Sequence, residues 1–182
     1  MLLKVYKSRV WIMLFMLLPF IGKAQLPPNL PTGWEFTLNP TSATYAIPTT
    51  VAFNGVDALQ AGDWIGAFYD DAGVLKCAGA VEWTGTENVA LVAFGNDELE
   101  PVKNGFFENE LVQWKFYRTA TSTEECVKAF DALNAEFYWT NGDLDEVASF
   151  GPCEIICEQS FNFTAGWNWI SFNVLPELAD LN

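Results

Sequence analysis

Clustered side-chain oxygens are the first groups in this 182-residue chain that suggest chemistry. Asn141, Asp143 and Asp145 place such oxygens at alternate positions, and calcium is bound by carboxylate and amide oxygens of this kind. The glycine and the distal glutamate of an EF-hand loop are misplaced here, so an acidic turn is the alternative interpretation. We expect no cofactor other than a structural calcium ion. Its further candidate ligands are Asp63, Asp70, Asp71 and Asp97.

The sequence lacks the residue that most often acts as a catalytic base, because the chain contains no histidine. Ser-His and Cys-His nucleophiles are therefore unavailable, as are most ligand sets of metal hydrolases. Glycoside hydrolysis needs only two carboxylates about 5 to 10 Å apart, and the 23 acidic residues leave it open as an alternative. Because no motif singles out a pair, we predict that the protein is not an enzyme and assign no catalytic residue.

Aromatic rings form the second group of interest, since a sugar stacks its apolar face on an exposed ring. Trp34, Trp83 and Trp114 alternate with apolar residues and have polar neighbours, which predicts that all three lie in the core. Other rings lie near loops, and their facing is ambiguous. If a carbohydrate binds, we expect these rings to hold it; ordinary packing or a place at a sheet edge is the competing and more common role of such rings. They are Trp64, Tyr69, Tyr138 and Trp139.

The cysteines are even in number, which in an exported chain predicts disulfides. They are Cys77, Cys126, Cys153 and Cys157. Of the three pairings, we expect Cys77 with Cys126, a bridge between two strand residues far apart in the sequence. Cys153 and Cys157 would then close a small local loop or stay free. A zinc site is the competing interpretation, but the spacings match no common zinc ribbon.

Export is predicted from residues 1–24, which resemble a cleavable signal peptide. Three basic residues precede an apolar run over 10–21, and Gly22-Lys23-Ala24 offers small residues for cleavage before Gln25. The run is too short to span a bilayer comfortably, and no later segment is a better candidate. We therefore expect no stable membrane span after cleavage. The expected location is secreted or at the cell surface, with the periplasm as the alternative.

The charge of the mature chain limits its partners. Cleavage removes four basic residues and no acid, which leaves five basic and 23 acidic residues and a net charge of −18. Such a surface repels a phosphate backbone and an anionic membrane. Nucleic acid is therefore excluded, and the expected partners are a polysaccharide or neighbouring domains of a larger protein. Solubility alone is another use of this charge.

The candidate residues lie in or beside short segments in which apolar and polar residues alternate. Gly, Asn, Asp and Pro separate these segments, a pattern typical of antiparallel β proteins. We predict an all-β fold, an antiparallel β-sandwich of jelly-roll or Ig-like type. A hairpin is expected over 64–83, and the longest loop over 95–110. The expected strands are 34–38, 43–47, 49–53, 64–69, 74–83, 88–94, 111–118, 125–130, 135–139, 155–163 and 167–174.

The domain organisation follows from the same pattern. A linker is expected over 25–33 and the sandwich domain over 34–155. Gly151-Pro152 interrupts the alternation and marks a boundary. Residues 156–182 would then be closing strands or the start of a second β-domain, and we expect this last part to be truncated, since one or two strands make no stable sheet.

Several motifs carry a resemblance to a known family. They are 62–69 (GDWIGAFY), 75–83 (LKCAGAVEW), 95–97 (GND), 104–106 (NGF) and 114–116 (WKF). Together they resemble a β-sandwich module of secreted and surface multidomain proteins of Bacteroidota-type bacteria, which are commonly exported by the type IX system. The segment 165–174 (AGWNWISFNV) is similar to the start of a further β-domain of such proteins.

The resemblance implies an extracellular, non-catalytic module in the company of adhesins and polysaccharide-handling proteins, and it offers no catalytic residues. The sorting domain that the family would lead us to expect is not in this sequence, which implies a fragment or another export route. We therefore expect a binding or adhesion module of a larger secreted or surface protein, with carbohydrate as a candidate ligand. A structural spacer is the alternative, and a glycoside-active enzyme is less favoured.

Overall fold

The computed structural model describes residues 26–153, and in this part of the chain all regular secondary structure is β. The all-β prediction is thus confirmed. The strands are β1 (Ser42–Ile47), β2 (Ala52–Phe53), β3 (Trp64–Asp71), β4 (Val74–Glu82), β5 (Val89–Phe94), β6 (Glu110–Leu111), β7 (Gln113–Arg118), β8 (Thr123–Phe130), β9 (Tyr138–Trp139), β10 (Leu144–Glu146) and β11 (Ser149–Pro152).

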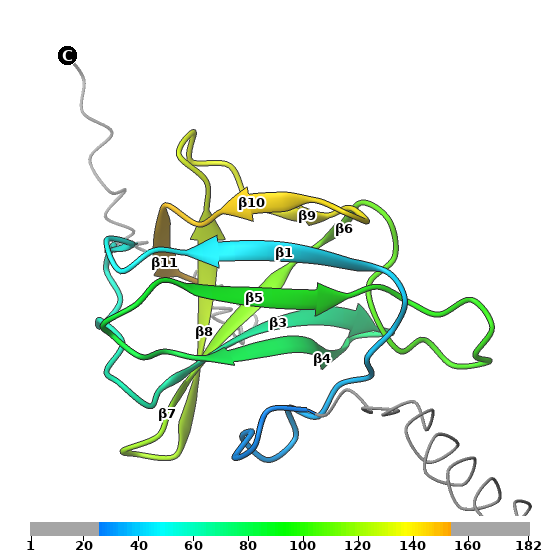
Figure 1. Ribbon diagram of the computed structural model, residues 1–182, viewed down its shortest axis with the longest axis horizontal. Coiled ribbons are helices and arrows are strands. Elements are labelled where there is room, and N and C mark those ends of the chain that lie inside the picture. Colours follow the sequence, from blue (N-terminus) through cyan, green and yellow to red (C-terminus); the bar gives the residue numbers. More distant parts are fainter. Residues whose placement is uncertain (1–25, 154–182) are drawn as a thin grey trace, which may run out of the picture.

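Two main sheets pack in a sandwich-like arrangement (Figure 1). One has three strands in the order β10-β1-β5, and the other has six in the order β2-β11-β8-β7-β3-β4. A small ribbon of β6 and β9 lies beside them. The predicted hairpin over 64–83 is confirmed, since β3 and β4 pair antiparallel around the turn at Asp70 to Gly73.

The expectation of purely antiparallel pairing is wrong at two places. β10 runs parallel to β1, and β11 runs parallel to β2. The reason is that the chain crosses from the small to the large sheet twice, between β1 and β2 and again between β10 and β11. The two crossings run side by side in the same direction, and the hydrogen bond from Val147 N to Ala46 O (2.9 Å) helps join them.

The core lies between the two sheets and is rich in aromatic rings. Alternation along β1 turns Ala43, Tyr45 and Ile47 inward, as the two-residue period of a strand requires. Tyr45 meets the ring of Trp114 from β7 edge to face at 5.2 Å. Trp34, Trp83 and Trp114 are 0%, 4% and 2% exposed, so the prediction that they are buried is confirmed.

The sheets meet along one edge, where β4 and β5 lie side by side without a hydrogen-bonded ladder (Figure 1). Gly79 allows this contact, because a Cβ at this position would collide with the carbonyl oxygen of Val92. The close approach of two backbones is a use for which glycine is suited. The glycine of the 75–83 motif therefore serves to close the sandwich.

The segment before β1 covers the outer face of the large sheet instead of forming the strand predicted over 34–38. The ring of Trp34 packs against Phe68 at a centroid distance of 5.0 Å, and its Nε1 donates a hydrogen bond to Glu124 Oε1 (2.8 Å). Leu30, within the predicted linker, packs against the same cluster. Apolar and polar residues alternate over 34–38 because one side of this segment packs against the protein. The segment does not pair with a neighbouring strand.

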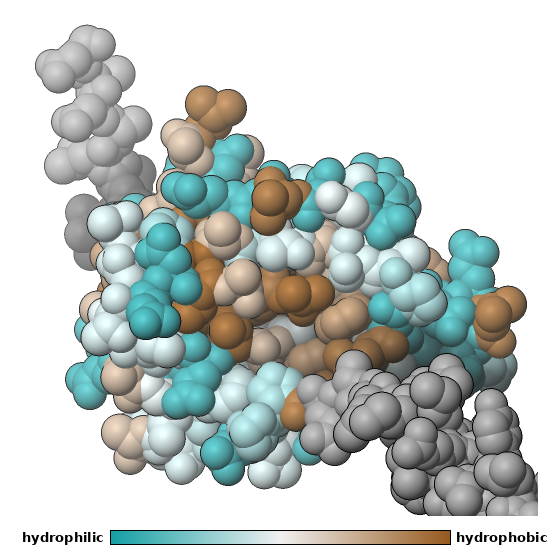
Figure 2. Space-filling view, in the orientation of Figure 1, coloured by the Kyte–Doolittle hydropathy of each residue, from teal (hydrophilic) through white to brown (hydrophobic). Residues whose placement is uncertain are grey.

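The face of the small sheet that points away from the core is also apolar. Figure 2 shows hydrophobic residues gathered over β1, β5 and β4. Ala46, Ala90 and Val92 point outward from β1 and β5, beside the polar Ser42 and Thr44 of β1. Phe36 covers part of this face, since its ring stacks on Phe94 at 5.9 Å. The segment before β1 thus packs against both sheets.

The disulfide joins Cys126 to Cys153, with their Cα atoms 5.7 Å apart, so the predicted Cys77–Cys126 pairing is wrong. Cys77 lies on β4 and Cys126 on β8, and β3 and β7 separate these strands. Three strand spacings of about 4.8 Å exceed the span of a disulfide. Cys77 is instead a buried free thiol. Cys157 and the strands predicted over 155–163 and 167–174 lie outside the described residues.

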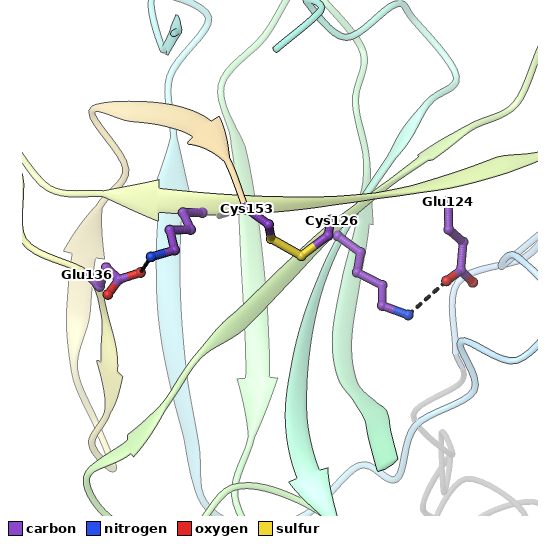
Figure 3. Close-up of a disulfide and its surroundings, with 6 residues drawn as sticks. Glu124, Cys126, Glu136 and Cys153 are labelled. Atoms are coloured by element: carbon purple, nitrogen blue, oxygen red, sulfur yellow. Dashed lines mark hydrogen bonds and ion pairs between the residues drawn. A yellow bond between two sulfur atoms is a disulfide. The ribbon is translucent and has the colours of Figure 1, made fainter. Parts of the chain in front are cut away.

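Two ion pairs flank this disulfide on the outer face of the large sheet (Figure 3). Lys128 contacts Glu136 at 3.2 Å and Lys115 contacts Glu124 at 2.8 Å. The bridge ties the end of β11 to β8, its antiparallel neighbour. A disulfide is compatible with an oxidising compartment. Within residues 26–153, no helix has the length and apolar character needed to cross a membrane.

Candidate functional site

The loop between β5 and β6 projects beyond the end of the sheets, at the right of Figure 1. It carries the GND and NGF motifs and four acidic residues, Asp97, Glu98, Glu100 and Glu108. Loops at the ends of a sandwich are common positions for binding residues, because a rigid framework holds them. Residues 95–109 are therefore the first candidate for a binding surface.

Side-chain amides fix the shape of this loop. Asn96 Oδ1 accepts a hydrogen bond from Asn104 N (2.9 Å), and Asn104 Oδ1 accepts one from Asp97 N (2.9 Å). Backbone bonds from Asn96 N to Phe106 O (2.7 Å) and from Phe106 N to Phe94 O (3.1 Å) close its base. Because its backbone is bonded internally, the loop is already ordered. Little conformational entropy would therefore be lost when a ligand binds to its side chains.

An ion pair fastens the loop to the β3–β4 hairpin. Lys103 Nζ lies 2.8 Å from both carboxylate oxygens of Glu110 and donates to Asp70 O at 2.6 Å. The ammonium also lies over the rings of Tyr69 (5.1 Å) and Phe107 (4.6 Å), an arrangement that favours a cation. Lys103 is therefore committed to internal contacts.

The first cleft beside the loop has a volume of about 220 Å³ and is here called the aromatic cleft. Phe106 and Trp139 line it, with their rings stacked at 6.2 Å and only 1% and 3% exposed. Phe107 also borders it and is 53% exposed. The polar residues of the lining are Thr41, Asn96, Glu98, Glu108 and Asn141.

The same loop lines a second cleft of about 530 Å³, here called the acidic cleft. Its carboxylates are Asp97 and Glu100, and Leu38, Pro40 and Val102 provide apolar surface. Thr37, Asn39 and Asn104 complete the lining. Each cleft therefore combines apolar groups with two carboxylates, and no basic residue lines either one.

The aromatic residues predicted to bind a carbohydrate occupy different places. Trp139 lines the aromatic cleft. Tyr138 is 56% exposed but lines neither cleft, because neighbouring strand residues point to opposite sides. Trp64 is buried on the outer face of the large sheet, although it borders a hollow of about 400 Å³ there. Tyr69 is buried beneath Lys103, and burial raises the pKa of its hydroxyl.

Phe107 is the site residue that the sequence analysis did not identify. It lies in a turn-rich acidic loop, where period-two alternation gives no information about facing. The available signal was the Phe106-Phe107 pair itself, because two adjacent rings on an extended backbone point to opposite sides and one of them must face outward. Phe106 is 1% exposed and Phe107 is 53% exposed.

The predicted calcium ligands are distributed over several parts of the fold. Asp63 is buried and accepts hydrogen bonds from Gln60 N (2.9 Å) and Thr119 N (3.0 Å). Asp70 and Asp71 belong to the hairpin turn, where Asp70 Oδ1 accepts a hydrogen bond from Gly73 N (2.6 Å). These three carboxylates are used in local structure.

The other candidate ligands do not form one cluster, although Asp143, exposed just before β10, lies close enough to Asp145 for its charge to act there. Asp97 lines the acidic cleft and Asn141 the aromatic cleft. Asp145 lies on β10, where burial, and then the charges of Asp143 and Asp131, raise the pKa of its carboxyl. Among residues 26–153, no group of three or more acidic or cysteine side chains is arranged to hold a metal ion.

Every basic residue of the described part forms an ion pair. Lys103, Lys115 and Lys128 have the partners given above, and Lys76 pairs with Asp71. Arg118 pairs with Asp63 and Glu125 and also donates to the carbonyl oxygens of Asp57 and Ala58. The hollow around Arg118 therefore has no unsatisfied guanidinium to offer an anion.

Comparison with models of protein families finds no match to this chain, and searches of curated proteins and of solved structures likewise find none. The two clefts are therefore the features of the described residues that point to a function.

Proposed function

We propose that this protein is a non-catalytic binding module of an exported protein, and that it holds a carbohydrate in the aromatic cleft. The observation that carries this proposal is the exposed ring of Phe107 at a cleft with carboxylates and amides. A sugar ring has an apolar face that stacks on an aromatic ring and hydroxyl groups that bond to such polar side chains.

The geometry supports a small binding site. The cleft volume of about 220 Å³ is below the range of about 300–1,000 Å³ usual for drug-sized ligands, which suits one sugar ring or a chain end. Trp139 is fixed by a hydrogen bond from its Nε1 to Ala93 O (3.0 Å), so the stacked rings of Phe106 and Trp139 are a rigid part of the site.

The resemblance to modules of Bacteroidota-type surface proteins and the signal-like residues 1–24 support an extracellular setting. In the jelly-roll or Ig-like sandwich that we propose, loops gather at the two ends of the sheets. The β5–β6 loop occupies such a position. Secretion or cell-surface display remains part of the proposal.

The test is binding of the mature chain to immobilised polysaccharides, followed by Phe107→Ala. We expect at least one neutral glycan to be retained by the wild-type protein, and about a tenfold loss of affinity in the variant. Tyr138→Ala is the matched control, because it removes an equally exposed ring that lines neither cleft. Retention of no glycan would favour the structural spacer instead, and equal losses in both variants would show that the glycan does not bind in the aromatic cleft.

A further inference from the structure

The acidic cleft has the shape and chemistry of a receptor for a long side chain that is apolar along its stem and positive at its end. Leu38 and Val102 are 37% and 62% exposed and provide apolar surface beside Pro40. Asp97 and Glu100 add negative charge to the same cleft. Lysine and arginine are the side chains that join an aliphatic stem to a cation.

A buried amide joins the two walls of the cleft. Asn39 lines the cleft and is only 8% exposed. Its Nδ2 donates to Gly95 O (2.7 Å), Asn104 O (3.3 Å) and Asn104 Oδ1 (3.0 Å). These bonds tie residues 37–40 to the β5–β6 loop, so the walls of the cleft are held in place before a ligand binds.

The carboxylates of the cleft have no internal counter-charge. Lys103, the basic residue of the same loop, is held by Glu110, and the other basic residues of the described part pair elsewhere. Asp97 Oδ1 accepts a hydrogen bond from Leu99 N (3.0 Å), and within residues 26–153 neither Asp97 nor Glu100 forms an ion pair. A cationic ligand would therefore not have to displace a neighbouring lysine or arginine.

We propose that the acidic cleft binds a lysine or arginine side chain presented by a peptide segment of a protein partner. The stem packs on Leu38, Pro40 and Val102, and the cationic end lies between Asp97 and Glu100. Leu99 is 92% exposed on the same loop and offers the peptide an apolar contact outside the cleft. This surface would give the module a protein partner in addition to its carbohydrate.

Fluorescence polarisation tests this proposal with the mature chain and a labelled Gly-Ser peptide that carries arginine residues. We expect Glu100→Gln to weaken binding about fivefold, the loss of one partly exposed ion pair. Glu87→Gln is the matched control, because Glu87 precedes β5 at the end opposite the loop and the substitution changes the net charge equally. Val102→Ser should also weaken binding, since it removes apolar surface under the stem.

The controls separate a specific cleft from general attraction. Replacement of the arginines by citrulline should abolish binding, and Phe107→Ala should leave it unchanged, which keeps this result independent of the carbohydrate site. Equal losses in Glu100→Gln and Glu87→Gln would overturn the proposal, because the attraction would then come from net charge alone. Spermidine that binds as tightly as the peptide would also overturn it, by identifying a free polyamine as the ligand.

Discussion

Trp34 owes its burial to the absence of a side chain at residue 66. A Cβ on Gly66 would lie 2.6 Å from Trp34 Cζ3 and 2.7 Å from Phe68 Cε2. Both distances are shorter than non-bonded carbon atoms tolerate. The glycine within the GDWIGAFY motif is therefore explained by packing, and the segment before β1 depends on it.

Gly66→Ala should destabilise the protein by about 1–3 kcal/mol, the usual cost of an extra methyl group in a filled site. Urea unfolding followed by tryptophan fluorescence measures the change. In Trp34→Ala the ring that the methyl group meets is gone, so the double variant should lose less than the sum of the two single losses. Simple additivity would show that Gly66 acts through something other than Trp34.

Cys77 illustrates how burial controls a thiol. It is 4% exposed among the apolar residues of the outer face, and burial raises its pKa to about 12. A thiol reacts as its thiolate, so at neutral pH this cysteine behaves as a small apolar side chain. Its role in the fold is packing. The strand pattern around Cys77 does not distinguish a packed thiol from a bridged one, which is why the predicted bridge to Cys126 was wrong.

At the scale of elements, local patterns were predictable and long-range pairing was not. The β3–β4 hairpin followed from the turn residues around Gly73 between two alternating runs. β10 and β11 were missed because 140–152 is polar and broken by Gly142 and Pro152, and these strands exist through parallel pairing with β1 and β2. The paired strands are about 100 residues apart in the sequence. Strands as short as β10 and β11 contain too few residues to show the alternation of apolar and polar residues by which a strand is predicted.

In the candidate site, too, single residues could be predicted from local patterns, but the contacts between distant residues could not. Trp139 and Asn141 could be selected from the sequence because they are an aromatic and an amide next to a turn. Their meeting with Phe107 depends on the β6–β9 ribbon, in which Glu110 pairs with Trp139. The acidic cleft likewise joins residues 37–40 to a loop about 60 residues later, and no local pattern predicts that contact.

The Cys126–Cys153 disulfide stabilises β11, which has only four residues. The bridged cysteines are 27 residues apart, and a loop of that length corresponds to about 3–4 kcal/mol of chain entropy. Replacement of both cysteines by serine should lower the free energy of unfolding by about that amount. Urea unfolding with and without reductant gives the measurement.

Reductant should lower the stability of the wild-type protein and of Cys77→Ala alike, and it should leave the Cys126→Ser/Cys153→Ser variant unchanged. A remaining effect of reductant in that double variant would point to a disulfide that involves another cysteine. Cys77→Ala is a suitable control, because it removes a buried free thiol without touching the bridge.

The whole molecule is organised around an excess of negative charge. Within residues 26–153 each lysine and arginine is paired with a carboxylate. Residues 25–182 nevertheless carry a net charge of −18, from five basic and 23 acidic residues. The remaining carboxylates therefore repel one another, and self-repulsion of this kind destabilises a compact state. The two clefts share this negative potential, which favours cationic and neutral ligands over anionic ones.

Sodium chloride should consequently raise the melting temperature of the mature protein. The screening length falls from about 30 Å at 0.01 M salt to about 3 Å at 1 M, so repulsion across the molecule is removed, while surface ion pairs contribute too little to offset the gain. A gain of about 1 kcal/mol would raise Tm by about 2–4 °C in a chain of this size. Choline chloride should act equally, because screening does not depend on the identity of the cation. A Tm that falls with salt would mean that the ion pairs outweigh the repulsion, and a rise with calcium alone at low ionic strength would indicate a specific metal site.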